Sequence, residues 1–86
     1  MSKYSFIAKF EPGENNNFGV YFPELPGCIS AGQTLIAARE NAKEALLLHL
    51  EGLFLDDDTI PENQTLEDLF YGEGELTSLI TVEAEF

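Results

Sequence analysis

The fold of this chain is decided by residues 18–28, which read Phe18-Gly19-Val20-Tyr21-Phe22-Pro23-Glu24-Leu25-Pro26-Gly27-Cys28. The first five of these residues are rich in aromatic and β-branched side chains and therefore predict a strand. Pro23 and Pro26 lack a backbone N–H, so the strand cannot continue through them. Gly27 is expected to adopt a backbone angle that other residues avoid, and residues 28–31 then predict a third, short strand.

The residues before this stretch alternate with period two. One face of residues 4–10 carries four apolar side chains: Tyr4, Phe6, Ala8 and Phe10. This alternation predicts a strand. Residues 11–17 contain Pro, Gly and three consecutive Asn residues, which are typical of turns. The first two strands should therefore form an antiparallel hairpin.

Residues 35–53 change to helical spacing, and Thr34 is a suitable N-cap for the helix that they predict. One apolar stripe of this helix should lie on the sheet, and it consists of Leu35, Ala38, Ala42, Ala45, Leu46, His49 and Leu53. The apolar residues outside this stripe are Ile36, Leu47, Leu48 and Leu50. One sheet cannot cover both sets, so we expect the second set to contact either another copy of the chain or a later segment of the same chain.

Residues 56–61 predict an acidic loop and residues 66–71 a short helix that Thr65 could cap, ended by a turn at 72–74. The last nine residues, 78–86, alternate again and predict a strand. Its apolar face carries Ile80, Val82, Ala84 and Phe86, and the other face carries Glu83 and Glu85. We therefore predict an α+β fold in a single domain spanning residues 1–86, with one main helix packed on an antiparallel sheet of three to four strands.

Charge narrows the functions open to this chain. The 86 residues contain 16 acidic and 4 basic side chains, which gives a formal net charge of −12. Residues 1–43 are neutral in sum, and the whole excess lies in residues 44–86. Such a chain is unsuited to bind nucleic acid or anionic membranes directly, because both require Lys and Arg. The excess is either a solvated surface or a surface that meets a basic partner.

The inventory of reactive side chains is short. Cys28 is the only cysteine and His49 the only histidine, so an internal disulfide and the usual zinc sites are excluded. We expect no metal and no cofactor. The sequence opens without an apolar signal stretch, so a cytoplasmic location is the simplest expectation.

The stretch at residues 18–28 resembles the signature of the HicB-like antitoxin family, in which a strand precedes F-P-D/E-L-P-G-C. The resemblance continues through residues 31–34, 40–46 and 50–53 and includes the acidic loop before Ile60-Pro61. It covers residues 4–61 well and residues 79–86 more loosely.

The resemblance implies a partly degenerate ribonuclease-H-like fold and the role of antitoxin in a type II toxin–antitoxin pair. The implied partner is a small basic HicA-type toxin that cleaves mRNA, and family members commonly form dimers or tetramers. Many members add a C-terminal module that binds operator DNA. This sequence ends at Phe86 without room for one, so we expect a stand-alone or a trimmed member.

Two sets of residues are candidates for contact with a basic toxin. The acidic set consists of Glu24, Asp56, Asp57, Asp58 and Glu62, and the apolar set consists of Tyr21, Phe22 and Leu25. The first set would complement the toxin's charge and the second would anchor it. The alternatives are solvated loops for the acidic set and core or turn packing for the apolar set. Pro23, Pro26 and Gly27 should hold the loop in shape.

Two other functions stay open. The chain could be an orphan homo-oligomeric binding module of the same fold, with no toxin. It could also be a metal-dependent nuclease, since that chemistry requires several carboxylates on core strands. Glu83 and Glu85 alternate with apolar residues and should face outward, so we expect no enzymatic activity.

Overall fold

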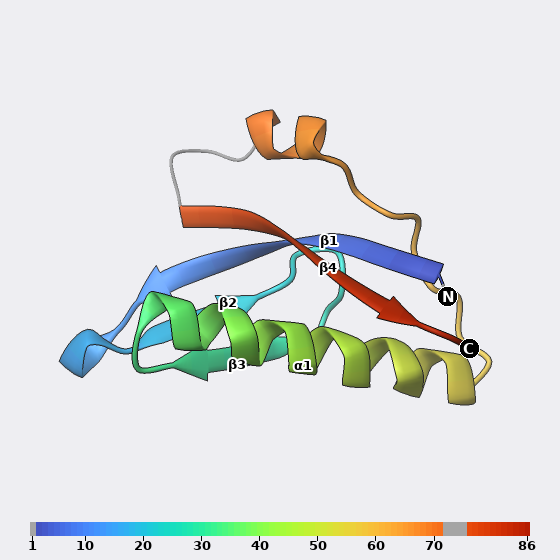
Figure 1. Ribbon diagram of the computed structural model, residues 1–86, viewed down its shortest axis with the longest axis horizontal. Coiled ribbons are helices and arrows are strands. Elements are labelled where there is room, and N and C mark those ends of the chain that lie inside the picture. Colours follow the sequence, from blue (N-terminus) through green and yellow to red (C-terminus); the bar gives the residue numbers. More distant parts are fainter. Residues whose placement is uncertain (1, 72–75) are drawn as a thin grey trace.

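The computed structural model describes residues 2–71 and 76–86 and shows one long helix lying on a four-stranded antiparallel sheet (Figure 1). In chain order the elements are β1 (Ser2–Pro12), the 3-10 helix η1 (Glu14–Asn16), β2 (Phe18–Tyr21), β3 (Ile29–Gly32), α1 (Leu35–Leu55), the 3-10 helix η2 (Leu66–Tyr71) and β4 (Leu76–Ala84). The strands lie in the order β3-β2-β1-β4. The predicted α+β fold is confirmed, while the turn predicted at 72–74 lies outside the described residues.

The core lies between α1 and one face of the sheet. Phe6, Ala8 and Phe10 of β1 are buried there, as the alternation predicts. Phe6 pairs with Ile80 of β4, which is also fully buried. The last strand thus lies beside the first, and both bury the faces that their sequences indicate.

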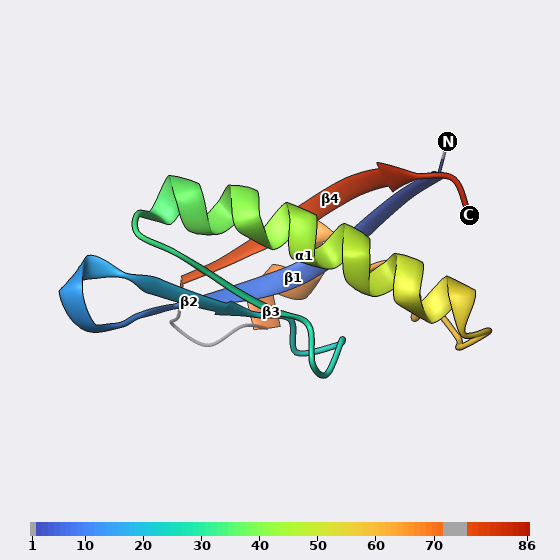
Figure 2. The same ribbon diagram turned by 90° about the horizontal axis from the view of Figure 1, so that it is seen from below.

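The helix buries three residues of the predicted stripe, Ala38, Ala42 and Leu46, and in addition buries Leu50, which was predicted to lie outside it. They are four positions apart, so each step turns the buried line about 40° round the helix, and α1 lies across a twisted sheet (Figure 2). Leu50 has no exposed surface, so its prediction as an oligomer contact is wrong. Ile36 (78% exposed) and Leu48 (68% exposed) point away from the core, and Leu47 is half-buried.

The start of α1 is fixed in two ways. The Oγ1 atom of Thr34 accepts a hydrogen bond of 3.0 Å from the N–H of Ala37, which confirms the predicted N-cap. Gly32, at the end of β3, lies directly under the helix, where an added Cβ would come within 2.6 Å of Cα of Ala38. Only glycine permits this close approach of strand and helix.

The opposite face of the sheet is partly covered by residues 61–71. Four hydrogen bonds tie Asn63 and Gln64 to the part of β1 that β2 does not reach. The bonds are Ser5 N to Asn63 Oδ1 (3.1 Å), Gln64 N to Ser5 O (2.8 Å), Ile7 N to Gln64 Oε1 (2.8 Å) and Asn63 Nδ2 to Lys3 O (3.0 Å). They satisfy backbone groups that would otherwise lie unpaired at this edge of β1. Ile7 is buried on this face, away from α1.

Among the described residues, the structure contains no helix that is both long and apolar enough to cross a membrane.

Candidate functional site

One row of side chains crosses the sheet on the face away from α1. Strand pairing places Ile29 of β3 beside Tyr21 of β2, Tyr21 beside Lys9 of β1, and Lys9 beside Thr77 of β4. These positions alternate with the core-facing positions of the same strands, so the four side chains lie on the opposite face. Ile29 is 70% exposed and Tyr21 is half-buried. The row thus offers an apolar end at β3 and a polar end at β4.

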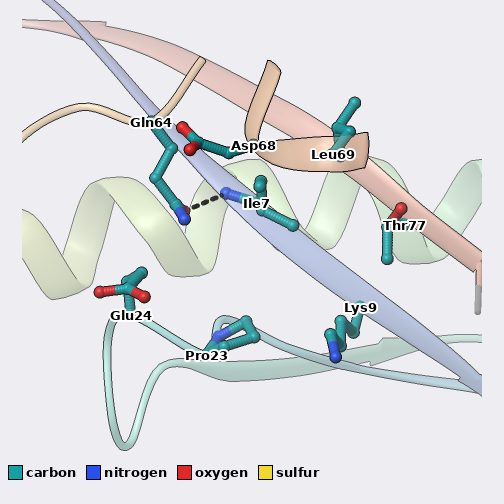
Figure 3. A pocket seen from close by; sticks show the side chains of 8 residues that line it. All are labelled: Ile7, Lys9, Pro23, Glu24, Gln64, Asp68, Leu69 and Thr77. Carbon is teal, nitrogen blue, oxygen red and sulfur yellow. Dashed lines mark hydrogen bonds between the residues drawn. The ribbon is translucent and has the colours of Figure 1, made fainter. Parts of the chain in front are cut away.

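The polar end of this row opens into a cavity of about 290 Å³ (Figure 3). It is lined by Ile7, Lys9, Pro23, Glu24, Gln64, Asp68, Leu69 and Thr77. These residues come from four parts of the chain: β1, β4, the loop after β2, and the segment that leads into η2 together with η2 itself. The cavity therefore exists only because residues 61–71 return across the sheet.

Two consecutive turns hold Glu24 at the edge of this cavity. The N–H of Leu25 donates to the carbonyl of Phe22, and the N–H of Cys28 donates to the carbonyl of Leu25, each at 3.0 Å. Pro23 occupies the second position of the first turn. In the second turn Pro26 precedes Gly27, whose φ of +87° matches the third position of a type II turn. The predicted backbone angle at Gly27 is thereby confirmed.

Phe22 and Leu25 anchor the same loop to the hydrophobic core. Each is 2% exposed and belongs to the hydrophobic core. Their prediction as surface anchors for a partner is therefore wrong in this structure, and the alternative of core packing is correct. Burial of side chains of this size contributes about 1.5–3 kcal/mol each, which holds the loop on the core while Glu24 stays exposed.

Asp68 is held on the other side of the cavity by the start of η2. Its Oδ2 atom accepts hydrogen bonds from the backbone N–H of Thr65 at 2.7 Å and from the Thr65 hydroxyl at 3.4 Å. Both bonds end on Oδ2 of Asp68. Thr65 immediately precedes η2, and its hydroxyl donates to Asp68 rather than accepting a hydrogen bond from a backbone N–H of the helix, as a cap would.

The remaining acidic candidates lie elsewhere. Asp56, Asp57 and Asp58 are exposed in the loop that follows α1, at the end of the molecule where the two termini lie (Figure 1). Glu62 is also exposed, and none of these four residues lines the cavity. The structure thus brings Glu24 and Tyr21 to one face and leaves the other acidic candidates apart from them.

Sequence reasoning missed Lys9, Gln64, Asp68 and Thr77. They are far apart in the chain, and only the return of residues 61–71 over β1 brings them together. Two features of the sequence could have indicated these residues. The alternation of residues 4–10 makes Ile7 and Lys9 face away from the core, and Asn63-Gln64 is a pair of amide side chains that can bond to the backbone of a strand edge.

Cys28 faces the core, as predicted, and its thiol donates to the carbonyl of Ala45 at 3.6 Å. Burial raises the pKa of this thiol to about 11, so it stays protonated at neutral pH and is a poor nucleophile. Across residues 2–71 and 76–86, no three His, Cys, Asp or Glu side chains come together in a way that could hold a metal ion.

Comparisons with known proteins place this fold and this loop in one family. A family model described as "HicB_like antitoxin of bacterial toxin-antitoxin system" matches residues 6–84. The crystal structure of the N-terminal domain of the Burkholderia pseudomallei antitoxin HicB matches with a TM-score of 0.76 and 28% identity, covering 93% of this chain and 99% of that one. A chain of a HicA3 and HicB3 toxin–antitoxin complex matches with a TM-score of 0.61 and 27% identity, covering 91% of this chain and 94% of that one.

A phage protein is similar in sequence. It is an uncharacterized 14.9 kDa protein from the rep-hol intergenic region of Haemophilus phage HP1 (strain HP1c1), and it is 45% identical over 53 residues. The matched part is 62% of this chain and 40% of the phage protein, so this chain spans well under two thirds of that relative. Since the family model covers nearly the whole sequence, the chain belongs to the HicB-like antitoxin family of bacterial toxin–antitoxin systems.

Proposed function

We propose that this chain is an antitoxin that binds and neutralises a small, basic, mRNA-cleaving toxin of the HicA type. Membership of the HicB-like family and the likeness to a chain of a HicA3–HicB3 complex support a toxin as the partner. The chain would act by binding alone and not as an enzyme. Since its target would act on bacterial mRNA, we place this function in the cytoplasm.

The observation that best supports this proposal is the exposed face of the sheet, on the side away from α1. Ile29 and Tyr21 present apolar surface there, and the cavity beside them is edged by Glu24 and Asp68. Interfaces of this kind combine apolar anchors near the centre with charges that orient the partner. We therefore assign this face, rather than the outer side of α1, to the toxin.

The charge of the whole chain supports the same partner. A toxin that cleaves mRNA must carry positive charge to bind phosphate, and a chain of net charge −12 attracts it from a distance. Asp56, Asp57, Asp58 and Glu62 would speed the encounter without lying at the centre of the contact. Screening by salt should therefore slow association more than it speeds dissociation.

Co-expression with a cognate HicA-type toxin tests the proposal. We expect the chain to restore growth, to protect mRNA from cleavage and to co-elute with the toxin in size-exclusion chromatography. If the folded chain neither binds the toxin nor relieves cleavage, the antitoxin role is wrong and an orphan binding module is favoured.

A further inference from the structure

We propose that the cavity beside Glu24 receives the side chain of one lysine or arginine from a protein partner. The inference rests on the proposed function only for the source of that side chain, which would be the toxin. The argument for the side chain itself comes from the size, lining and rigidity of the cavity.

The size of the cavity suits a single long side chain. Its volume of about 290 Å³ lies just below the range for small-molecule pockets, which is about 300–1,000 Å³. It is therefore small for a nucleotide. It opens on the exposed face of the sheet beside Tyr21, so a side chain projecting from a docked protein can enter it.

The cavity is lined by groups that suit both the methylene stem and the charged end of a lysine or arginine side chain. Ile7, Pro23 and Leu69 offer apolar surface for a methylene stem, as lysine and arginine stems require. Glu24 and Asp68 offer carboxylates for the charged end, with which an ammonium or guanidinium forms charge-assisted hydrogen bonds.

The balance of charge favours a cation over an anion. Lys9 also lines the cavity, so the charged groups that the described residues place there are two carboxylates and one ammonium, which sum to −1. The rest of the molecule adds to this bias, because the whole chain carries −12. An anionic ligand would be repelled by both.

The backbone that carries Glu24 and the carboxylate of Asp68 are held before any partner arrives. Glu24 sits on two hydrogen-bonded turns that Phe22 and Leu25 fix to the core. Asp68 lines the cavity, and its carboxylate is fixed by the N–H and hydroxyl of Thr65. A site arranged in advance loses little conformational entropy on binding, so even a small ligand should bind measurably.

Short peptides test the inference without the toxin. The labelled chain is titrated with acetyl-Gly-Arg-Gly-amide, acetyl-Gly-Lys-Gly-amide and, as a neutral isostere, acetyl-Gly-citrulline-Gly-amide, while backbone amide signals are followed by NMR. We expect saturable shifts at Ile7, Leu69 and Thr77 with one or both of the cationic peptides and none with the citrulline peptide. An equal response to citrulline, or no saturable response at these amides, would overturn the inference.

Matched variants locate the site. E24Q/D68N removes two negative charges from the cavity and keeps an oxygen that can accept from Thr65. The control E44Q/E51Q removes two charges at exposed positions of α1, and neither residue lines the cavity. The first variant should weaken peptide binding about tenfold or more, and the control should leave it nearly unchanged. Equal losses in both would overturn the inference, because they would indicate general attraction only.

Measurements of toxin binding distinguish a failure of this inference from a failure of the proposed function. If E24Q/D68N binds the toxin as well as the parent chain does, the cavity does not receive a basic side chain, while the antitoxin role stands. If the peptides bind in the cavity but the toxin does not bind the chain at all, the antitoxin role fails and the cavity remains a site for a basic side chain.

Discussion

The backbone N–H of Ile7 donates a hydrogen bond of 2.8 Å to Oε1 of Gln64, 57 residues later in the chain. This bond joins the middle of β1 to the segment that leads into η2. Ile7 and Gln64 both line the cavity, and Asp68 and Leu69, which also line it, follow four and five residues after Gln64. This bond is thus one of the contacts that position the lining of the candidate site.

Replacement of Gln64 by Ala should loosen this segment. It leaves the N–H of Ile7 without its partner, and a lost hydrogen bond of this kind costs about 1–3 kcal/mol of unfolding free energy. Urea denaturation measures the loss, and hydrogen exchange at the Ile7 amide should become faster. Thr59→Ala, in the exposed loop before this segment, is the control and should change neither quantity. Unaltered exchange at Ile7 in Gln64→Ala would contradict this role.

Two glycines should respond to alanine in opposite directions. At Gly32 the new Cβ would collide with the backbone of Ala38, so Gly32→Ala should destabilise the protein strongly, by about 2 kcal/mol or more. At Gly52, inside α1, nothing lies within 4 Å of the new Cβ, so Gly52→Ala should stabilise by about 0.5–1 kcal/mol. Thermal unfolding of both variants checks this contrast, and a destabilised Gly52→Ala would count against the described helix.

Cys28 should make stability depend on alkaline pH. Its pKa is about 11 in the folded chain against an ordinary value of 9.0, so the unfolded chain loses the proton first as pH rises. The stabilising contribution is complete below pH 9 and is lost progressively between pH 9 and 11. Cys28→Ala should lack this part of the pH dependence in urea titrations at pH 8 and pH 10.5. A parallel decline in both proteins would show that other groups are responsible.

Self-association is a separate expectation, which we assign to the outer side of α1. Leu48 and Leu55 lie on one line of the helix, seven residues apart, and both are exposed. A second copy that presents the same line would cover them, since a two-fold interface uses the same residues twice. Light scattering should show a dimer or a larger assembly that L48E/L55E converts to a monomer. A strictly monomeric parent chain at micromolar concentration would rule out this interface.

Local patterns predicted the fold well. The alternation of residues 4–10 and 78–86 identified the faces of β1 and β4, and Thr34 marked the start of α1. These features depend on neighbours in sequence. The predicted stripe of α1 was correct for Ala38, Ala42 and Leu46 but missed Leu50, because the twist of the sheet beneath the helix is not revealed by sequence spacing.

The candidate site could be predicted only in part. Glu24 and Tyr21 came from the stretch at residues 18–28, whose prolines and glycine signal a shaped loop. Asp68 and Lys9 escaped prediction because a cavity forms between segments that meet only after folding. Phe22 and Leu25 were ambiguous because an apolar residue beside a turn can serve the core or a partner equally well, and only its burial distinguishes the two.

The central claim is that the exposed face of the sheet binds a HicA-type toxin. Hydrogen exchange measured on the chain with and without the toxin tests it most directly. We predict that the toxin slows exchange at Tyr21, Glu24, Ile29 and the residues of η2, and leaves the outer side of α1 unchanged. Protection confined to α1, with exchange on the sheet face unaltered, would contradict the account.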